Sequence, residues 1–227
     1  MFEFLKKLLS SDLNELYRKG EFCILRGDYG KALEYYEEFL KIEPVNIPVI
    51  KKKIFALFSL EMYEEVIESI DKLLAILPED IEALNGKGLT LFRQEKYEEA
   101  MLYYERVLTI NPENREAMEG KAWTLYALKD YEKVIDWSYK ILTRDTSWPY
   151  TWGVRAMSMS ALTRYEEAID CYNKALKIDE KYIDAWNGKG LALYGLGRYE
   201  EAIQCQNKAI EISSELLRSL ESPEETK

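Results

Sequence analysis

The chain has 227 residues, of which 47% are hydrophobic and 32% charged, a composition typical of an ordered protein with a packed core. It contains no histidine, which excludes Ser-His-Asp triads, Cys-His dyads and histidine metal sites. A net charge of −10 argues against general nucleic-acid binding, because such binding relies on Lys and Arg to neutralise phosphates.

Three scattered cysteines form neither a disulfide framework nor a metal-binding motif. The apolar runs are far too short to span a membrane. Charges at Glu3, Lys6 and Lys7 interrupt the first apolar stretch, so no secretory signal is evident. We therefore expect a cytoplasmic protein with no membrane span, no metal and no cofactor.

A period of 34 residues runs through the chain. A tyrosine recurs at this spacing in every repeat: Tyr29, Tyr63, Tyr97, Tyr131, Tyr165 and Tyr199. Prolines at Pro44, Pro78 and Pro112 have the same spacing. The chain between residues 13 and 216 thus divides into six repeats without insertion: 13–46, 47–80, 81–114, 115–148, 149–182 and 183–216.

Each repeat has the pattern of two helices. In the sixth repeat, Trp186, Gly190 and Leu193 recur at spacings of three and four, as one face of a helix requires. A turn follows at Gly197, and the spacing begins again at Tyr199. Neither helix can bury its apolar face alone, so stacking of the repeats into an α-solenoid is expected.

The last repeat also carries a set of residues typical of one family. These residues are Ala185, Trp186, Asn187, Gly190, Leu196, Gly197, Tyr199, Ala202 and Ala209. Over residues 13–216 the chain resembles the tetratricopeptide repeat (TPR) family. The resemblance implies an all-α fold, a right-handed α-solenoid of antiparallel helix pairs (a TPR superhelix). It also implies a non-enzymatic role in protein–protein recognition through a concave groove.

The concave face of such a solenoid is formed by the second, fifth, ninth and twelfth positions of each first helix. From the second repeat onward these positions are rich in apolar and aromatic residues, and an exposed apolar row usually marks an interaction surface. The candidate partner-binding residues are Lys51, Phe55, Phe58, Asn85, Leu89, Phe92, Trp123, Tyr126, Tyr150 and Met157. The competing interpretation is that neighbouring helices cover these rings as ordinary core.

These residues predict a scaffold that binds a helix or an extended peptide segment of a partner protein, in a groove centred on repeats two to four. The alternative is a self-assembling structural or regulatory subunit that forms homo-oligomers through the solenoid ends or the groove. Capture of a C-terminal carboxylate, as in chaperone-adaptor members of the family, is disfavoured. Glu82, Glu116 or Asp184 stands where that function needs a lysine.

Two further features allow two interpretations each. The seventh position of every repeat is basic: Lys19, Lys53, Lys87, Lys121, Arg155 and Lys189. This column is either a cationic ladder for an acidic ligand or, as we favour, a set of aliphatic stems packed between helices with their charges reaching internal acceptors. Trp148-Pro149-Tyr150, between the fourth and fifth repeats, is either a second anchor or a loop plug.

The ends of the solenoid need covers. We expect residues 1–12 to form an N-terminal capping helix, with contact to a membrane surface through Lys6 and Lys7 as the alternative. Residues 217–227 are expected to form a C-terminal cap stub and a solvated tail.

Overall fold

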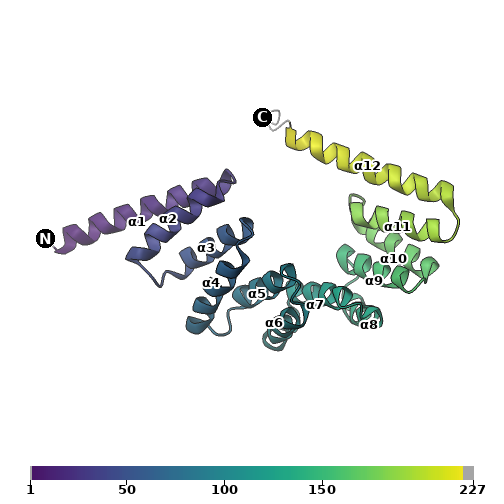
Figure 1. The fold of residues 1–227 in the computed structure, drawn as a ribbon, viewed down its shortest axis with the longest axis horizontal. Coiled ribbons are helices and arrows are strands. Elements are labelled where there is room, and N and C mark those ends of the chain that lie inside the picture. Colours follow the sequence, from purple (N-terminus) through teal and green to yellow (C-terminus); the bar gives the residue numbers. More distant parts are fainter. Residues whose placement is uncertain (1, 222–227) are drawn as a thin grey trace. The chain divides into compact units, whose positions relative to one another are not determined.

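The computed structural model describes residues 2–221, and the side chains of residues 12–218. In this part of the chain every regular element is an α-helix, which confirms the predicted fold class (Figure 1). The helices are α1 (Phe2–Leu25), α2 (Tyr29–Ile42), α3 (Ile47–Ser59), α4 (Tyr63–Ile76), α5 (Ile81–Arg93), α6 (Tyr97–Ile110), α7 (Arg115–Ala127), α8 (Tyr131–Leu142), α9 (Pro149–Ala161), α10 (Tyr165–Ile178), α11 (Ile183–Gly195) and α12 (Tyr199–Glu221).

The turn inside each helix pair has the same backbone conformation in all six repeats. Its middle residue lies in the left-handed region, with φ between 58° and 75°. These middle residues are Gly27, Glu61, Glu95, Lys129, Thr163 and Gly197. Only the first and last repeats place glycine there, so the four inner turns hold a non-glycine residue in a conformation that costs about 1 kcal/mol.

The helices begin with residues that stabilise a helix N-terminus. Asp80 caps α5, because its Oδ1 accepts a hydrogen bond of 2.8 Å from the backbone N–H of Ala83. Asn46 caps α3 in the same way. Acidic pairs such as Glu64 and Glu65 lie in the first turn of the second helix, where they face the positive end of the helix dipole.

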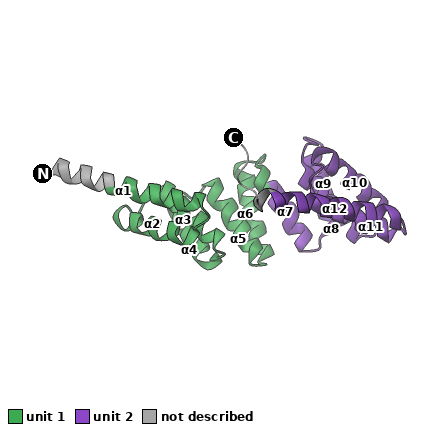
Figure 2. Ribbon diagram, turned by 90° about the horizontal axis from the view of Figure 1, so that it is seen from above, with its two compact units in different colours: residues 1–117 green, residues 118–227 purple. Residues whose placement is uncertain are grey.

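The chain forms two compact units, residues 1–117 and 118–227, shown in different colours in Figure 2. In unit 1 the core consists of three clusters. Each cluster includes the third residue of the next repeat's first helix: Val49, Ala83 or Ala117. Every repeat of this unit thus completes its core with a residue of its successor, as stacking predicts.

Close approach of the two helices depends on glycine in the third repeat. A side chain at Gly88 would collide with the ring of Tyr104, which is almost fully buried. In the second repeat the same two positions hold Ile54 and Ile70, both in one core cluster. Ile54 is larger than the glycine of the third repeat, and its partner Ile70 is smaller than the tyrosine there. The two changes compensate in volume, so the fold is retained.

Unit 2 has one large core cluster, which joins α9, α10, α11 and α12. Helix α8 ends early, at Leu142, so that a longer connection leads to α9. Trp148 fills this connection: its side chain is buried and its Nε1–H donates to Asp145 Oδ2 at 2.7 Å. For Trp148 this contact agrees with the loop-plug interpretation.

At both ends of the chain the backbone continues a repeat helix. Helix α1 starts at Phe2 and runs through residue 12 into the first repeat, and α12 runs from Tyr199 to Glu221. The terminal segments 1–12 and 217–227 were expected as separate caps, but no helix boundary falls at residue 12 or 217. The side chains of residues 1–11 and 219–227 lie outside the described part, and the capping role stays a prediction.

Among the helices of residues 2–221, none combines the length and the apolar composition needed to cross a bilayer.

Candidate peptide-binding groove

In unit 1 the ninth position of the first helices carries the exposed apolar side chains of the predicted row. In unit 1, Phe55 on α3 is 49% exposed and Leu89 on α5 is 40% exposed. Phe55 has one ring neighbour, Tyr29, at a centroid distance of 6.0 Å. These two side chains are therefore available to a ligand on unit 1.

The rings at the twelfth position have internal partners. Phe58 packs edge-on against Tyr63 at 5.7 Å, and Phe92 packs against Tyr97 at 5.3 Å. Both phenylalanines are only partly exposed and border the core clusters of their repeats. In these two repeats the recurrent tyrosine thus packs against the ring that precedes the turn, and these rings contribute to packing as well as to the groove surface.

The polar candidates of unit 1 are also engaged. The ammonium group of Lys51 lies 2.8 Å from Asp80 Oδ2 and 2.6 Å from Glu82 Oε2. Asn85 is buried, and its Nδ2 donates to Glu116 Oε2 and to Asn114 Oδ1 at 3.0 Å each. Lys51 and Asn85 therefore connect successive repeats, and the free surface there comes mainly from the apolar residues.

In unit 2 the predicted row opens into a cavity of about 660 Å³. Trp123 and Tyr126 come from α7, Met157 from α9, and Leu191 from α11. The remaining lining residues are Ser160, Ala161, Tyr165, Tyr172, Asp184, Asn187, Gly188 and Ala192. The volume falls in the range of ligand pockets and suits one large or two small side chains of a peptide.

The electrostatics of this cavity favour an apolar ligand with a hydrogen-bonding or basic neighbour. Burial raises the pKa of Tyr172 to about 12, and the nearby carboxylate of Asp184 adds to the rise. Burial also raises the pKa of Tyr126. Both phenols stay protonated at neutral pH and can donate. Asp184 is the one acidic residue among those that line the cavity, and it is exposed at its edge.

Tyr150 was predicted to point to the groove. Its side chain is 45% exposed, and its ring packs edge-on against Tyr182 at 5.0 Å. Tyr182 is buried, and burial strongly raises the pKa of its phenol. Tyr150 does not line the cavity, so within unit 2 it offers a separate, partly exposed contact.

Sequence reasoning placed the centre of the groove on repeats two to four, whereas the cavity lies on repeats four to six. Asp184, Asn187 and Leu191 line this cavity and stand at the second, fifth and ninth positions that the sequence predicts to face the groove, but they were not among the named candidates. The signal was present, because Leu191 occupies the same ninth position as Trp123 and Met157 and is 67% exposed. In the described part of the chain, no group of acidic residues or cysteines is arranged to hold a metal ion.

A stack of 34-residue helix pairs whose first helices carry an apolar row defines a helical-repeat protein. Models described as "Tetratricopeptide repeat" match residues 81–114 and 183–216, and residues 16–46. A model described as "TPR repeat" matches residues 161–197. Together these segments cover more than half of the chain, which belongs to the tetratricopeptide repeat family.

Several solved structures have the same fold. A tetratricopeptide repeat protein from Parabacteroides merdae ATCC 43184 is 18% identical, with a TM-score of 0.76 over 88% of this chain and 80% of that one. YrrB, described as a TPR protein with an unusual peptide-binding site, is 17% identical, with a TM-score of 0.56 over 84% and 98%. MamA from Desulfovibrio magneticus RS-1 is 16% identical, with a TM-score of 0.54 over 90% and 96%. No curated protein sequence matches the chain.

Proposed function

We propose that this protein is a non-enzymatic scaffold that binds a segment of a partner protein in the cavity of unit 2. The observation that carries the proposal is the apolar opening of about 660 Å³ between α7, α9, α10 and α11, lined by the ninth-position residues Trp123, Met157 and Leu191. Aromatic and methionine side chains in a concave site are the usual anchors for peptides. The peptide-binding description of YrrB, which shares the fold, agrees with this role.

The cavity also indicates the kind of segment. An aliphatic or aromatic anchor residue would fill the space between Trp123 and Leu191, and a basic or amide group beside it would meet Asp184 and Asn187. On unit 1, Phe55 and Leu89 offer further apolar contact. A short segment with so few anchors is expected to bind with a dissociation constant in the micromolar to millimolar range, roughly −4 to −8 kcal/mol.

Selection from a random peptide library on the full-length chain tests the proposal, because no partner has to be known. The affinity of enriched peptides is then measured for Leu191→Glu, which places a charge in the cavity. Leu102→Glu on α6 is a matched control, since Leu102 is 65% exposed and does not line the cavity. Both positions are exposed, so both variants are expected to fold, which circular dichroism checks.

We expect Leu191→Glu to weaken the selected peptides at least tenfold, about 1.4 kcal/mol, and Leu102→Glu to leave them unchanged. A selection that yields only peptides indifferent to Leu191→Glu would contradict the proposal.

One observation favours self-association as a second candidate. On α12, Ile203, Ile210 and Leu217 follow each other at seven-residue spacing and are 59%, 63% and 60% exposed. The equivalents of the first two in the preceding repeat, Ile169 and Leu176, are each only 8% exposed. The last repeat thus presents a face that inner repeats bury, and an apolar seven-residue spacing is that of helix pairing.

Light scattering as a function of protein concentration tests this candidate. A dimer that Ile210→Glu converts into a monomer would support pairing through α12. A wild-type chain that stays monomeric at high concentration removes it.

A further inference from the structure

The basic column at the seventh position shows what its members normally contact. In unit 1 the ammonium group of Lys53 lies 2.8 Å from Glu37 Oε1, and that of Lys87 pairs with Asp71. Each acid occupies the twenty-fifth position of the preceding repeat. Lys87 also lies over the ring of Tyr103, at 4.8 Å from its centroid. Each of these charges is thus satisfied inside the protein, as the favoured interpretation predicts.

The ring comes from a constant place as well. Tyr103 is the twenty-third residue of its own repeat, and Trp137 at the same position of the fourth repeat lies 4.8 Å from the ammonium group of Lys121. A complete arrangement therefore has a base, an acid from the preceding repeat and an aromatic ring from its own repeat.

The fifth repeat lacks both internal partners. Where the acid is expected, the chain has Tyr139, and where the ring is expected it has Cys171. The guanidinium group of Arg155 lies over the ring of Tyr139 at 5.7 Å, and its Nε is buried with no hydrogen-bond partner. Among the side chains that the structure describes, Arg155 forms no ion pair. A buried donor without an acceptor is costly and needs an explanation.

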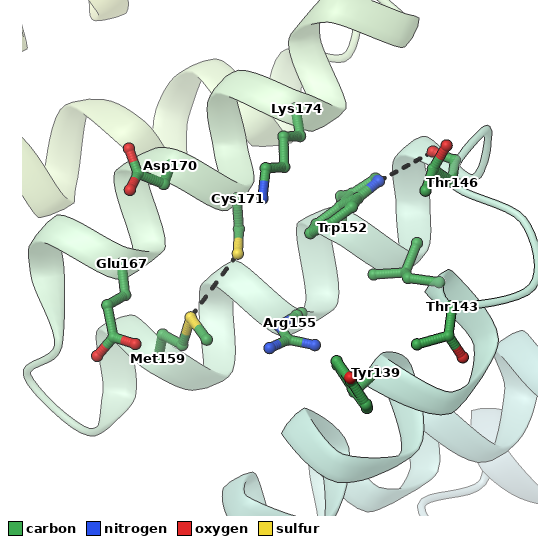
Figure 3. Close-up of a pocket in the computed structure, with 11 residues that line it drawn as sticks. Tyr139, Thr143, Thr146, Trp152, Arg155, Met159, Glu167, Asp170, Cys171 and Lys174 are labelled. Atoms are coloured by element: carbon green, nitrogen blue, oxygen red, sulfur yellow. Dashed lines mark hydrogen bonds between the residues drawn. The ribbon is translucent and has the colours of Figure 1, made fainter.

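The missing ring leaves a space. A cavity of about 310 Å³ opens beside Arg155, between α8, α9 and α10 (Figure 3). Lys174 also lines it and lies 4.5 Å from the ring centroid of Trp152. The indole Nε1–H of Trp152 donates to the backbone oxygen of Thr146 at 2.9 Å, which fixes this wall. The cavity thus holds two cations, each against an aromatic ring.

The thiol does not neutralise these cations, and among the described side chains no nearby acid forms an ion pair with them, although the charge of Arg155 contributes to the lowered pKa of Glu167. Burial raises the pKa of the Cys171 thiol even though Arg155 and Lys174 act against the rise, so the thiol stays neutral at pH 7. Glu167 is held by Arg164 through two hydrogen bonds of 2.6 and 2.7 Å.

The remaining acid of the lining, Asp170, is drawn on the far side of Cys171 from Trp152 (Figure 3).

We propose that this cavity binds a carboxylate group of a ligand, which pairs with Arg155 as Glu37 and Asp71 pair with the bases of the earlier repeats. The guanidinium group of Arg155 can donate to both oxygens of a carboxylate, and Lys174 adds a second positive charge. The cavity shares no residue with the larger cavity proposed to bind a peptide, so either site can fail without the other.

The sixth repeat also lacks the internal acid and the internal ring, so its base can be compared with Arg155. Its base, Lys189, also lacks the acid and the ring, because Asn173 and Cys205 occupy those positions. Lys189, however, lies over Trp186 of its own helix, at 5.4 Å. In the fifth repeat the equivalent Trp152 is covered by Lys174, and Arg155 lies instead over Tyr139, the residue that replaces the acid. The two repeats therefore differ in that the buried Nε of Arg155 has no hydrogen-bond partner and a cavity opens beside it.

The experiment is a ¹⁵N–¹H titration of the full chain that follows the Nε–H signal of Arg155 and the indole N–H signal of Trp152. The probes are sodium acetate, a short glutamate-containing peptide and inorganic phosphate, at constant ionic strength kept with sodium chloride. Cys171→Tyr restores the ring and fills the cavity, Arg155→Gln removes the cation, and Lys140→Gln is a control for an exposed cation outside the cavity. Because Arg155→Gln lacks the Nε–H signal, binding to this variant is followed through the indole N–H signal of Trp152.

We expect saturable shifts with acetate and with the peptide, at least tenfold weaker binding in Cys171→Tyr and in Arg155→Gln, and no change in Lys140→Gln. Tighter binding of the peptide than of acetate would assign the carboxylate to an acidic side chain, and equal binding would assign it to a free small acid. The proposal is overturned by shifts that do not saturate, by saturation with phosphate but not with acetate, or by equal binding in Cys171→Tyr and wild type.

Discussion

The two compact units use the same repeat positions in different ways. In unit 1, Lys51, Lys53 and Lys87 all pair with acids of the chain. In unit 2, Arg155 has no acid, and two cavities open beside the equivalent helices. A position that stabilises the stack in one repeat can therefore serve a ligand in another, once its internal partner is replaced.

The difference arises from single substitutions in a constant backbone. Lys87 and Arg155 occupy the same position of the same kind of helix, and only their neighbours differ: Asp71 and Tyr103 against Tyr139 and Cys171. The repeat geometry places a base at the seventh position, and the neighbouring residues determine whether that base has an internal partner.

The largest expected effect concerns the close packing of the two helices in the third repeat of unit 1. Gly88→Val should lower the free energy of unfolding by about 3 kcal/mol, because the added side chain meets the buried ring of Tyr104. Gly30→Ala is the matched control: nothing lies near its Cβ position, and we expect a small gain of about 0.5 kcal/mol. Urea denaturation of both variants measures the difference, and equal stabilities would show that the helices can separate at Gly88 without cost.

The buried tyrosines should make both units sensitive to alkali. Burial raises the pKa of Tyr172 to about 12 in unit 2, and burial also raises the pKa of Tyr104 in unit 1. A raised folded-state pKa gives stability that is present below pH 10 and is lost as pH rises from 10 through the folded value. For Tyr172 the loss by pH 12 is on the order of 2 kcal/mol.

Denaturation curves between pH 9 and 12 should show this fall, and Tyr172→Phe should reduce it. A fall that is as steep in Tyr172→Phe as in the wild type would contradict the assignment.

Removal of an acid in unit 1 should reproduce the situation of the fifth repeat. Asp71→Ala leaves the buried Lys87 without its partner, and we expect a loss of about 2 kcal/mol, less than for a fully buried pair because Asp71 is half-exposed. Glu68→Ala breaks an exposed pair with Lys72 on the same helix and should have almost no effect on stability, because solvent screens this pair. Thermal denaturation distinguishes the two, and similar small losses would mean that Lys87 does not need an internal acid.

The fold could be predicted from the sequence because its signals are periodic. The tyrosines at 34-residue spacing mark the second helices, and the first helices of repeats two to six begin at residues 47, 81, 115, 149 and 183, where the repeats begin. The contacts between helices were harder to predict from the sequence. A helical wheel treats one helix at a time, so it could not show that Tyr63 packs against Phe58 across the turn.

The proposed site at Arg155 could be predicted from the sequence only in part. Its basic character stood out in the column, and Tyr139 and Cys171 were visible as residues. What the sequence did not contain was the pairing rule, that the twenty-fifth position of one repeat faces the seventh of the next. That rule comes from packing, and Lys53 with Glu37 demonstrates it.

The smallest expected effect concerns the turns. Thr163 is β-branched and has a φ of 60°, so Thr163→Gly should raise the free energy of unfolding by about 0.5 kcal/mol. Gly197→Ala, at the same position of the sixth repeat, should lower it by about 1 kcal/mol. Urea denaturation measures both changes, and a loss of stability in Thr163→Gly would show that its side chain has a contact that outweighs the strain.

The central claim, that the fifth repeat lacks an acid which Arg155 would otherwise bind, is tested most directly by putting that acid back. Tyr139→Glu should raise the free energy of unfolding by about 1 kcal/mol in the unliganded protein, and the gain should vanish in an Arg155→Gln background, as a double-mutant cycle measures. A loss of stability, or a gain that persists without Arg155, would contradict the account.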